Sequence, residues 1–220
     1  MIAAIVALLC SPSLDALLAR VEKAYGGAAA LARVRVVRES GTLESPRGLA
    51  QTVRIFAPPD RLRVDIRYPD GSGELRVLAG PHAWRNGELV EGPPRDAMLL
   101  QAARLDLPGL LLRNRARLVD LGELHLDGQA LRGVGVPLEG NLQVAIGVDP
   151  KTGRIVHSEG QLPSPGGPLR FATRYQDFRA VDGVLFAFGE SNFASGQHTG
   201  ETRLSQIELL DAPPGGAFAP

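Results

Sequence analysis

Positions 61–68 alternate strictly between charged and apolar side chains. The apolar positions are Leu62, Val64, Ile66 and Tyr68. Because successive side chains of a β-strand point to opposite faces, this period of two predicts a strand with one polar and one apolar face. An antiparallel sheet can bury one face and expose the other, so the segment predicts a half-buried antiparallel strand.

Segments of the same kind follow one another along most of the chain. The first block predicts strands at 34–43, 50–57, 61–68 and 74–78, followed by a hairpin at 82–90. Asn86-Gly87 marks that hairpin, because both turn positions require positive φ.

A second block of strands runs from 117 to 210. Its turns are predicted at Asp127-Gly128, 149–153, Asp182-Gly183 and Ser195-Gly196. The loops between consecutive strands are short, which favours an antiparallel meander. The pattern gives about eleven strands, more than one flat sheet holds comfortably, so the sheet should curl. The expected fold class is mainly β (α+β).

Two regions have helical periodicity instead. In 14–25 a single apolar stripe recurs at helical spacing, with Ser13 as a candidate N-cap and Gly26-Gly27 as the end. A second short helix is expected at 28–33. Between the two strand blocks lies a helical island at 95–115, with Asp96 as a candidate cap and a restart at Pro108.

The island carries apolar residues on more than one face. Met98, Leu99, Ala102 and Leu105 share one helical face, and Leu111 follows in the second helical segment. One interpretation is an ordinary buried helix that closes the mouth of the sheet. The other is a lid whose apolar face covers a cavity that a lipid can also occupy.

The N-terminus has the pattern of an export signal. Residues 2–9 form an apolar run too short to span a bilayer, and Ser11-Pro12-Ser13 offers small residues for cleavage after Ser13. We therefore expect residues 1–13 to be a signal segment and 14–220 to form a single domain of an exported protein. The alternative is a buried N-terminal helix.

Composition excludes several classes of function. The only cysteine, Cys10, lies inside the expected signal, which leaves no disulfide scaffold and no cysteine nucleophile in the mature chain. Lipid anchoring at Cys10 is not expected, because the preceding Leu9 is large. Lys and Arg total 24, as do Asp and Glu, so no global charge attracts nucleic acid.

No arrangement of residues indicates catalysis. The four histidines are scattered without the spacing of metal ligands, and no G-x-S-x-G motif occurs. Gly133-Val134-Gly135 belongs to a strand rather than to a phosphate-binding turn before a helix. We expect no enzyme activity, no metal site and no cofactor.

Three segments together resemble the LolA/LolB superfamily of periplasmic lipoprotein and lipid carriers. The segments are VRIFAPPDRLRVDIRYPDGSGELRVLAGPHAW at 53–84, GVDPKTGRIVHSEG at 147–160 with FATRYQDFRAVDGVLFAF at 171–188, and IELLDAPPGGAFAP at 207–220. They match that family's Pro corner and "R-L-R" strand, its "D-P-x-T-G" hairpin with a "Y-x-D-F-R" strand, and its "F-x-P" tail. Two departures, Ala79-Gly80-Pro81 and Ala187, indicate a divergent relative.

The resemblance implies an incomplete antiparallel β-barrel wrapped around helices, with an apolar cavity between the concave sheet and a helical lid. It implies a periplasmic, monomeric carrier or binding protein for lipid or lipoprotein acyl chains, with envelope transport machinery as a further partner. Two alternatives stay open: an envelope assembly or sensing subunit that contacts a protein, and an enzyme with its substrate in the barrel mouth.

The ligand cavity can be predicted from the strand faces and the lid. Trp84 could stack on a ligand, although an aromatic residue on a strand is more often part of the core. The expected cavity residues are Val53, Ile55, Leu62, Val64 and Ile66 on the wall, Trp84, and Met98, Leu99, Ala102, Leu105 and Leu111 in the lid.

Overall fold

The computed structural model describes residues 13–220 and places thirteen strands in one antiparallel sheet. The first block contains β1 (Val36–Ser45), β2 (Gly48–Ala57), β3 (Arg61–Arg67), β4 (Gly73–Ala79), β5 (His82–Arg85) and β6 (Glu88–Val90). The second contains β7 (Val119–Leu126), β8 (Gln129–Pro137), β9 (Gln143–Val148), β10 (Ile155–Leu162), β11 (Leu169–Val181), β12 (Val184–Ala194) and β13 (Gln197–Leu210).

Each block is a meander, and the pairing of β1 with β13 joins the two blocks into one sheet. The edge strands β6 and β7 do not pair with each other, so the barrel is incomplete, as predicted. The number of strands is thirteen rather than about eleven. Asn86, Asp127, Asp182 and Ser195 have positive φ, each followed by a glycine that also does, which confirms these four turns.

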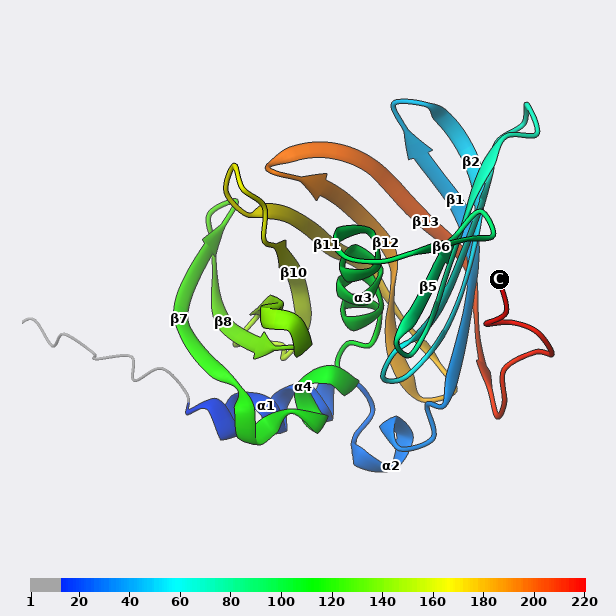
Figure 1. Cartoon of the computed structure of the whole chain (residues 1–220). Helices are drawn as coiled ribbons and strands as arrows, with labels where there is room; N and C mark the ends of the chain where they lie inside the picture. The colour runs from blue at the N-terminus through cyan, green and yellow to red at the C-terminus, as the bar shows by residue number, and fades with distance from the viewer. Residues whose placement is uncertain (1–12) are drawn as a thin grey trace, which may run out of the picture.

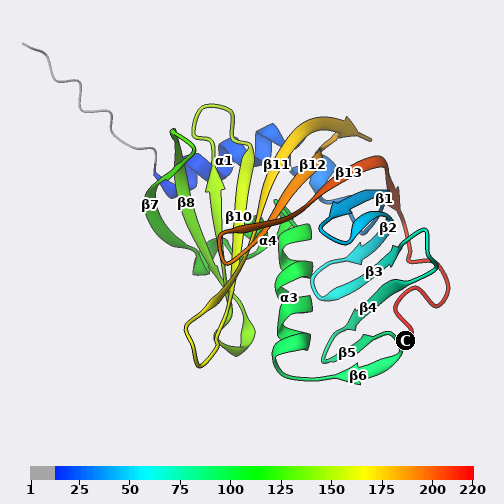
Figure 2. The same ribbon diagram turned by 90° about the horizontal axis from the view of Figure 1, so that it is seen from above.

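The helices are α1 (Leu14–Ala24), α2 (Ala28–Leu31), α3 (Pro93–Leu105) and α4 (Gly109–Arg113), with two short 3-10 helices at Arg115–Arg117 and Glu139–Asn141. Helix α3 lies inside the bend of the sheet, whereas α1 and α4 lie across one end (Figures 1 and 2). Within residues 13–220, no helix is long and apolar enough to cross a membrane.

The helix boundaries differ from the sequence prediction at the start of α3 and at the end of α2, which ends at Leu31 and not at residue 33. Ser13 caps α1 as expected, accepting a hydrogen bond from the Ala16 amide at 3.3 Å. Helix α3 begins at Pro93 after Gly92, so Asp96 lies in its first turn and is not the cap. The pair Pro93-Pro94 can open a helix because the first amides have no intrahelical acceptor. The expected signal segment and Cys10 lie outside the described residues, apart from Ser13.

One apolar core fills most of the space between the sheet and the helices. Its members on α1, α3, β8 and β9 include Leu17, Leu18, Val21, Leu99, Leu100, Val134, Val136, Val144, Ile146 and Val148. We call the side of the sheet that faces α3 the inner face and the opposite side the outer face. The core thus covers the inner face of β8 and β9.

A smaller apolar cluster lies on the outer face of β1 and β2. The C-terminal residues 211–220 fold back there, and Ala217 packs with Val36 and Ile55. Arg63 on β3 donates hydrogen bonds to the carbonyls of Ala217 and Ala219 at 3.5 and 3.4 Å. This part of the sheet is therefore covered on both faces.

Candidate functional site

A cleft of about 360 Å³ separates α3 from the inner face of β1–β3 and β11–β13. Helix α3 contributes Ala97, Gln101 and Arg104, whose spacing of four and three residues places them on one helical face. A volume of this size lies within the range of small-molecule sites, which is about 300–1,000 Å³. The cleft is therefore the main candidate for a binding site.

The cleft has two apolar walls. Val64 and Ile66 of β3 form one, and Phe171 of β11 with its paired neighbour Ala194 of β12 forms the other. A neighbouring space of about 220 Å³ shares Arg76, Ala97, Gln101 and Phe171 with the cleft and adds Met98. The two spaces are therefore contiguous beside α3.

Between these walls, the inner face of β1, β2 and β12 is polar and charged. Arg54 of β2 donates two hydrogen bonds to the carboxylate of Glu190 on β12, at 2.7 and 2.8 Å. Its Nε also lies 2.7 Å from Glu39 Oε2 on β1, in an ion pair without hydrogen-bond geometry. We call Arg54, Glu39 and Glu190 the charged triad.

Burial and charge shift the pKa values of the triad in opposite directions. Burial raises the pKa of Glu39, and nearby Glu190 adds to this, whereas Arg54 opposes it. Burial alone would lower the pKa of Arg54, but the charges of Glu190 and Glu39 outweigh burial and hold that pKa above its ordinary value. The triad thus keeps a guanidinium charged at the bottom of the cleft.

Arg104 lies beside the triad but contacts only neutral acceptors. Its Nη1 donates to the Phe171 carbonyl at 3.2 Å and to Thr173 Oγ1 at 3.1 Å, and its Nε donates to the Leu100 carbonyl at 3.3 Å. Burial lowers the pKa of Arg104. Across residues 13–220, no carboxylate comes within ion-pair distance of this guanidinium.

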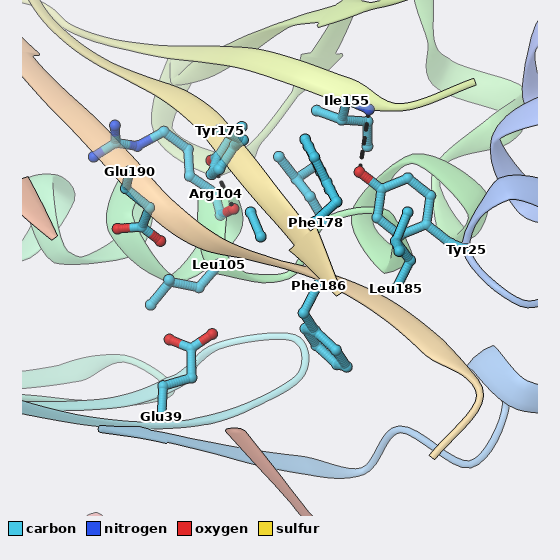
Figure 3. A pocket seen from close by; sticks show the side chains of 12 residues that line it. Tyr25, Glu39, Arg104, Leu105, Ile155, Tyr175, Phe178, Leu185, Phe186 and Glu190 are labelled. Atoms are coloured by element: carbon cyan, nitrogen blue, oxygen red, sulfur yellow. Dashed lines mark hydrogen bonds between the residues drawn. The ribbon is translucent and has the colours of Figure 1, made fainter. Parts of the chain in front are cut away.

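Arg104 and Glu190 also border a smaller inner chamber, with room of about 40 Å³ (Figure 3). At its far end, Tyr25 Oη accepts a hydrogen bond from the Ile155 amide at 3.1 Å. Tyr175 donates to the Arg104 carbonyl at 3.2 Å and contacts Ser158 Oγ at 2.7 Å. Burial raises the pKa of Tyr175 to about 12, so both tyrosines act here as neutral hydrogen-bonding groups.

The structure divides the predicted cavity residues into groups. Val64 and Ile66 line the cleft, Met98 lines the neighbouring space and Leu105 lines the inner chamber. The remaining inward residues are buried in the core: Leu62, Leu99, Ala102 and Leu111. The lid residues therefore pack against the sheet, and the polar side of α3 faces the cleft.

Three predicted cavity residues lie on the outer face, so their assignment to the cavity is wrong. Arg54 pairs with Val64 across β2 and β3, which places the flanking Val53 and Ile55 on the other side. Trp84 pairs with Val77, which in turn pairs with Arg63 on the outer face. The apolar positions of β2 follow the outer face here because the C-terminal tail covers it.

Sequence reasoning missed the polar lining of the cleft. The missed residues are Thr52, Arg54, Arg76, Gln101, Arg104, Glu190, Asn192, Thr199 and Thr202. Only Arg54 carried a signal, because it is the one charged residue in the apolar run 53–57. Within the described chain, no three His, Cys, Asp or Glu side chains gather as metal ligands would.

No protein-family model matches the sequence, and no curated protein matches it either. Among solved structures, a LolA superfamily protein from Nitrosomonas europaea has 13% identity, a TM-score of 0.57, and coverage of 94% of this chain and 97% of the other. A domain described as an outer membrane lipoprotein-sorting protein, from Vibrio parahaemolyticus, has 10% identity, a TM-score of 0.52, and coverage of 92% and 95%. These similarities confirm the predicted LolA-like fold.

Proposed function

We propose that this protein is a periplasmic carrier that holds a lipid or a lipoprotein acyl chain in the cleft beside α3. The observation that carries the proposal is a preformed cleft of about 360 Å³ with apolar walls on both sides. The LolA-like fold supports it, because one structural relative is described as a lipoprotein-sorting domain.

The walls offer an acyl chain a favourable environment. Each methylene removed from water contributes about 0.8 kcal/mol, so a long chain gains several kcal/mol even when part of it stays exposed. Val64, Ile66 and Phe171 provide apolar contact, and the space beside Met98 extends the path. The thioether of Met98 is suited to this position because it adapts to irregular contacts.

A carrier must also release its cargo, and the cleft has features that limit affinity. Its polar lining contributes no hydrophobic gain, and the apolar side of α3 is already buried against the sheet. The ligand therefore gains apolar contact from the walls of the cleft and not from the buried side of α3. We accordingly expect micromolar rather than nanomolar affinity, about −8 kcal/mol.

The test is to fill the cleft while keeping the fold. In Ala97→Trp an indole would occupy the space between α3 and the sheet, whereas in the control Ala19→Trp it would lie on the exposed face of α1. Both variants and the wild type would be titrated with a fluorescent acyl probe and melted in parallel.

We expect the wild type and Ala19→Trp to bind the probe, and Ala97→Trp to lose binding by about tenfold or more while melting cooperatively. Equal binding by all three proteins would place the probe outside the cleft. No binding by the wild type would overturn the proposed function.

A further inference from the structure

We propose that the cleft takes an amphiphile with an anionic headgroup, and that Arg104 binds this headgroup. The inference rests on the proposed function, because it specifies which acyl-bearing molecule the same cleft selects. The reason lies in the ionic partners of the three arginines that line the cleft.

Two of these arginines are already neutralised by carboxylates. Arg54 is held by Glu190 and Glu39 in the charged triad. Arg76 donates to both oxygens of Glu74, from Nε at 2.9 Å and from Nη2 at 2.7 Å. Neither guanidinium is therefore available as the main partner of a ligand anion.

Arg104 differs because its charge is paired with no carboxylate in the described part of the chain. Its Nη1 and Nε bond to neutral oxygens, and its Nη2 donates to none of residues 13–220. Figure 3 shows its guanidinium at the Glu190 end of the inner chamber, away from Tyr25. A half-buried guanidinium with donors directed to a cleft is suited to a carboxylate or phosphate.

Gln101 provides a second donor at the same place. It lies one turn before Arg104 on the same helical face, and its Oε1 accepts a hydrogen bond from Arg76 Nη1 at 3.2 Å. That bond fixes the oxygen of the amide toward Arg76 and leaves the amide NH₂ group as a donor. An anionic oxygen at Arg104 can therefore receive a hydrogen bond from Gln101.

The charge of Glu190 does not prevent this binding. Glu190 attracts Arg104 through its charge, but both of its carboxylate oxygens accept hydrogen bonds from Arg54, at 2.7 and 2.8 Å, so neither oxygen is bonded to the Arg104 guanidinium. The headgroup would meet Arg104 near the base of the cleft, and the chain would run along Val64, Ile66 and Phe171. This arrangement gives the two ends of an amphiphile separate surfaces.

The experiment compares ligands that share one chain and differ in the headgroup. The full chain would be loaded with the neutral probe N-phenyl-1-naphthylamine, and displacement by hexadecanoate, hexadecyl phosphate and hexadecanol would be measured. A charge-assisted hydrogen bond contributes about 1.5–3 kcal/mol, so both anions should displace the probe at roughly tenfold or more lower concentration than the alcohol.

Variants test whether Arg104 causes the preference. Arg104→Gln should make the three competitors equal, and Arg104→Lys should retain part of the preference because it keeps the charge. Arg38→Gln removes a positive charge on the exposed side of β1 and should leave the preference unchanged. A stronger effect of the phosphate than of the carboxylate would indicate a phospholipid-type headgroup, and the reverse a fatty acid.

Equal displacement of the probe by all three compounds in the wild type would overturn the headgroup inference and leave the carrier function standing. A preference that survives in Arg104→Gln would overturn the assignment to Arg104. If the wild type neither binds the probe nor releases it to any competitor, the proposed function itself fails.

Discussion

Two regions of the sheet, one near the β7 edge and one at its centre, present inner faces of different chemistry to the same helix. On β8 and β9 the inner residues are aliphatic and inaccessible to solvent, including Val134, Val136, Val144 and Ile146. On β2, β12 and β13 the inner face carries Thr52, Arg54, Glu190, Asn192 and Thr202. We call the first region the aliphatic arm and the second the cleft region.

The way α3 packs explains the difference. Leu100 lies so close to β10 that a Cβ added at Gly160 would be 3.1 Å from its Cδ2. On the cleft side, α3 presents Ala97, Gln101 and Arg104 and leaves about 360 Å³ open. The aliphatic arm therefore stabilises the fold, and the cleft region is free to bind.

Breaking the charged triad should cause the largest loss of stability among these predictions. Glu190→Gln removes the charge that holds Arg54 in a buried bidentate pair, so the free energy of unfolding should fall by about 3–5 kcal/mol. Glu39→Gln leaves that pair intact and should cost about 1 kcal/mol or less. Urea unfolding of both variants measures this, and equal losses would contradict the dominant role of Glu190.

The next largest difference in unfolding free energy should appear when the same substitution, isoleucine to glutamine, is made in each of the two regions. Ile146→Gln buries an amide without a partner in the aliphatic arm and should cost about 3 kcal/mol or more, combining lost burial with an unsatisfied amide. Ile66→Gln places the amide at the cleft, where water and polar groups can satisfy it, and should cost about 1 kcal/mol. Chemical denaturation checks both, and similar losses would remove the distinction between the regions.

The contribution of Glu39 to the free energy of unfolding should depend on pH, and this is the smallest of the predicted effects. Burial raises the pKa of Glu39 in the folded protein, so the folded state binds this proton more tightly than the unfolded state does. The stability that Glu39 contributes is present at low pH and is lost as pH rises from its ordinary pKa through the raised one.

The stability difference between wild type and Glu39→Gln should therefore fall across that window, by about 1.4 kcal/mol for each unit of pKa difference. Unfolding free energies of both proteins between acidic and neutral pH measure it. A difference that is constant or that increases with pH would show that Glu39 is not destabilised by burial.

The fold could be predicted from local signals, whereas the site required long-range contacts. The alternation at 61–68 placed Val64 and Ile66 correctly on the inner face, because the outer positions of β3 stay charged even where Arg63 contacts the C-terminal tail. In β2 the same reasoning failed. There the C-terminal tail covers the outer face, so the apolar Ile55 lies on that face and not on the inner one. The partner of Arg54 is 136 residues away in sequence, so no local pattern could identify it.

The lid could not be oriented from sequence for a related reason. Met98, Leu99 and Leu100 are three consecutive buried residues, so the helix is apolar around much of its circumference. Which side of α3 faces a cavity depends on how closely each part of the sheet approaches the helix. Gly160 on β10, which pairs with Val144 of the aliphatic arm, permits a close approach there.

Photolabelling tests the central claim most directly, because it reports where an acyl chain lies in the intact protein. A hexadecanoic acid carrying a diazirine would be bound, irradiated and mapped by peptide mass spectrometry, with unlabelled hexadecanoate as competitor. We expect saturable labelling of β3 and β11–β12, around Ile66, Phe171 and Ala194, and none of β8–β9. Labelling of β8–β9, or labelling that the competitor does not reduce, would contradict the assignment of ligand binding to the cleft.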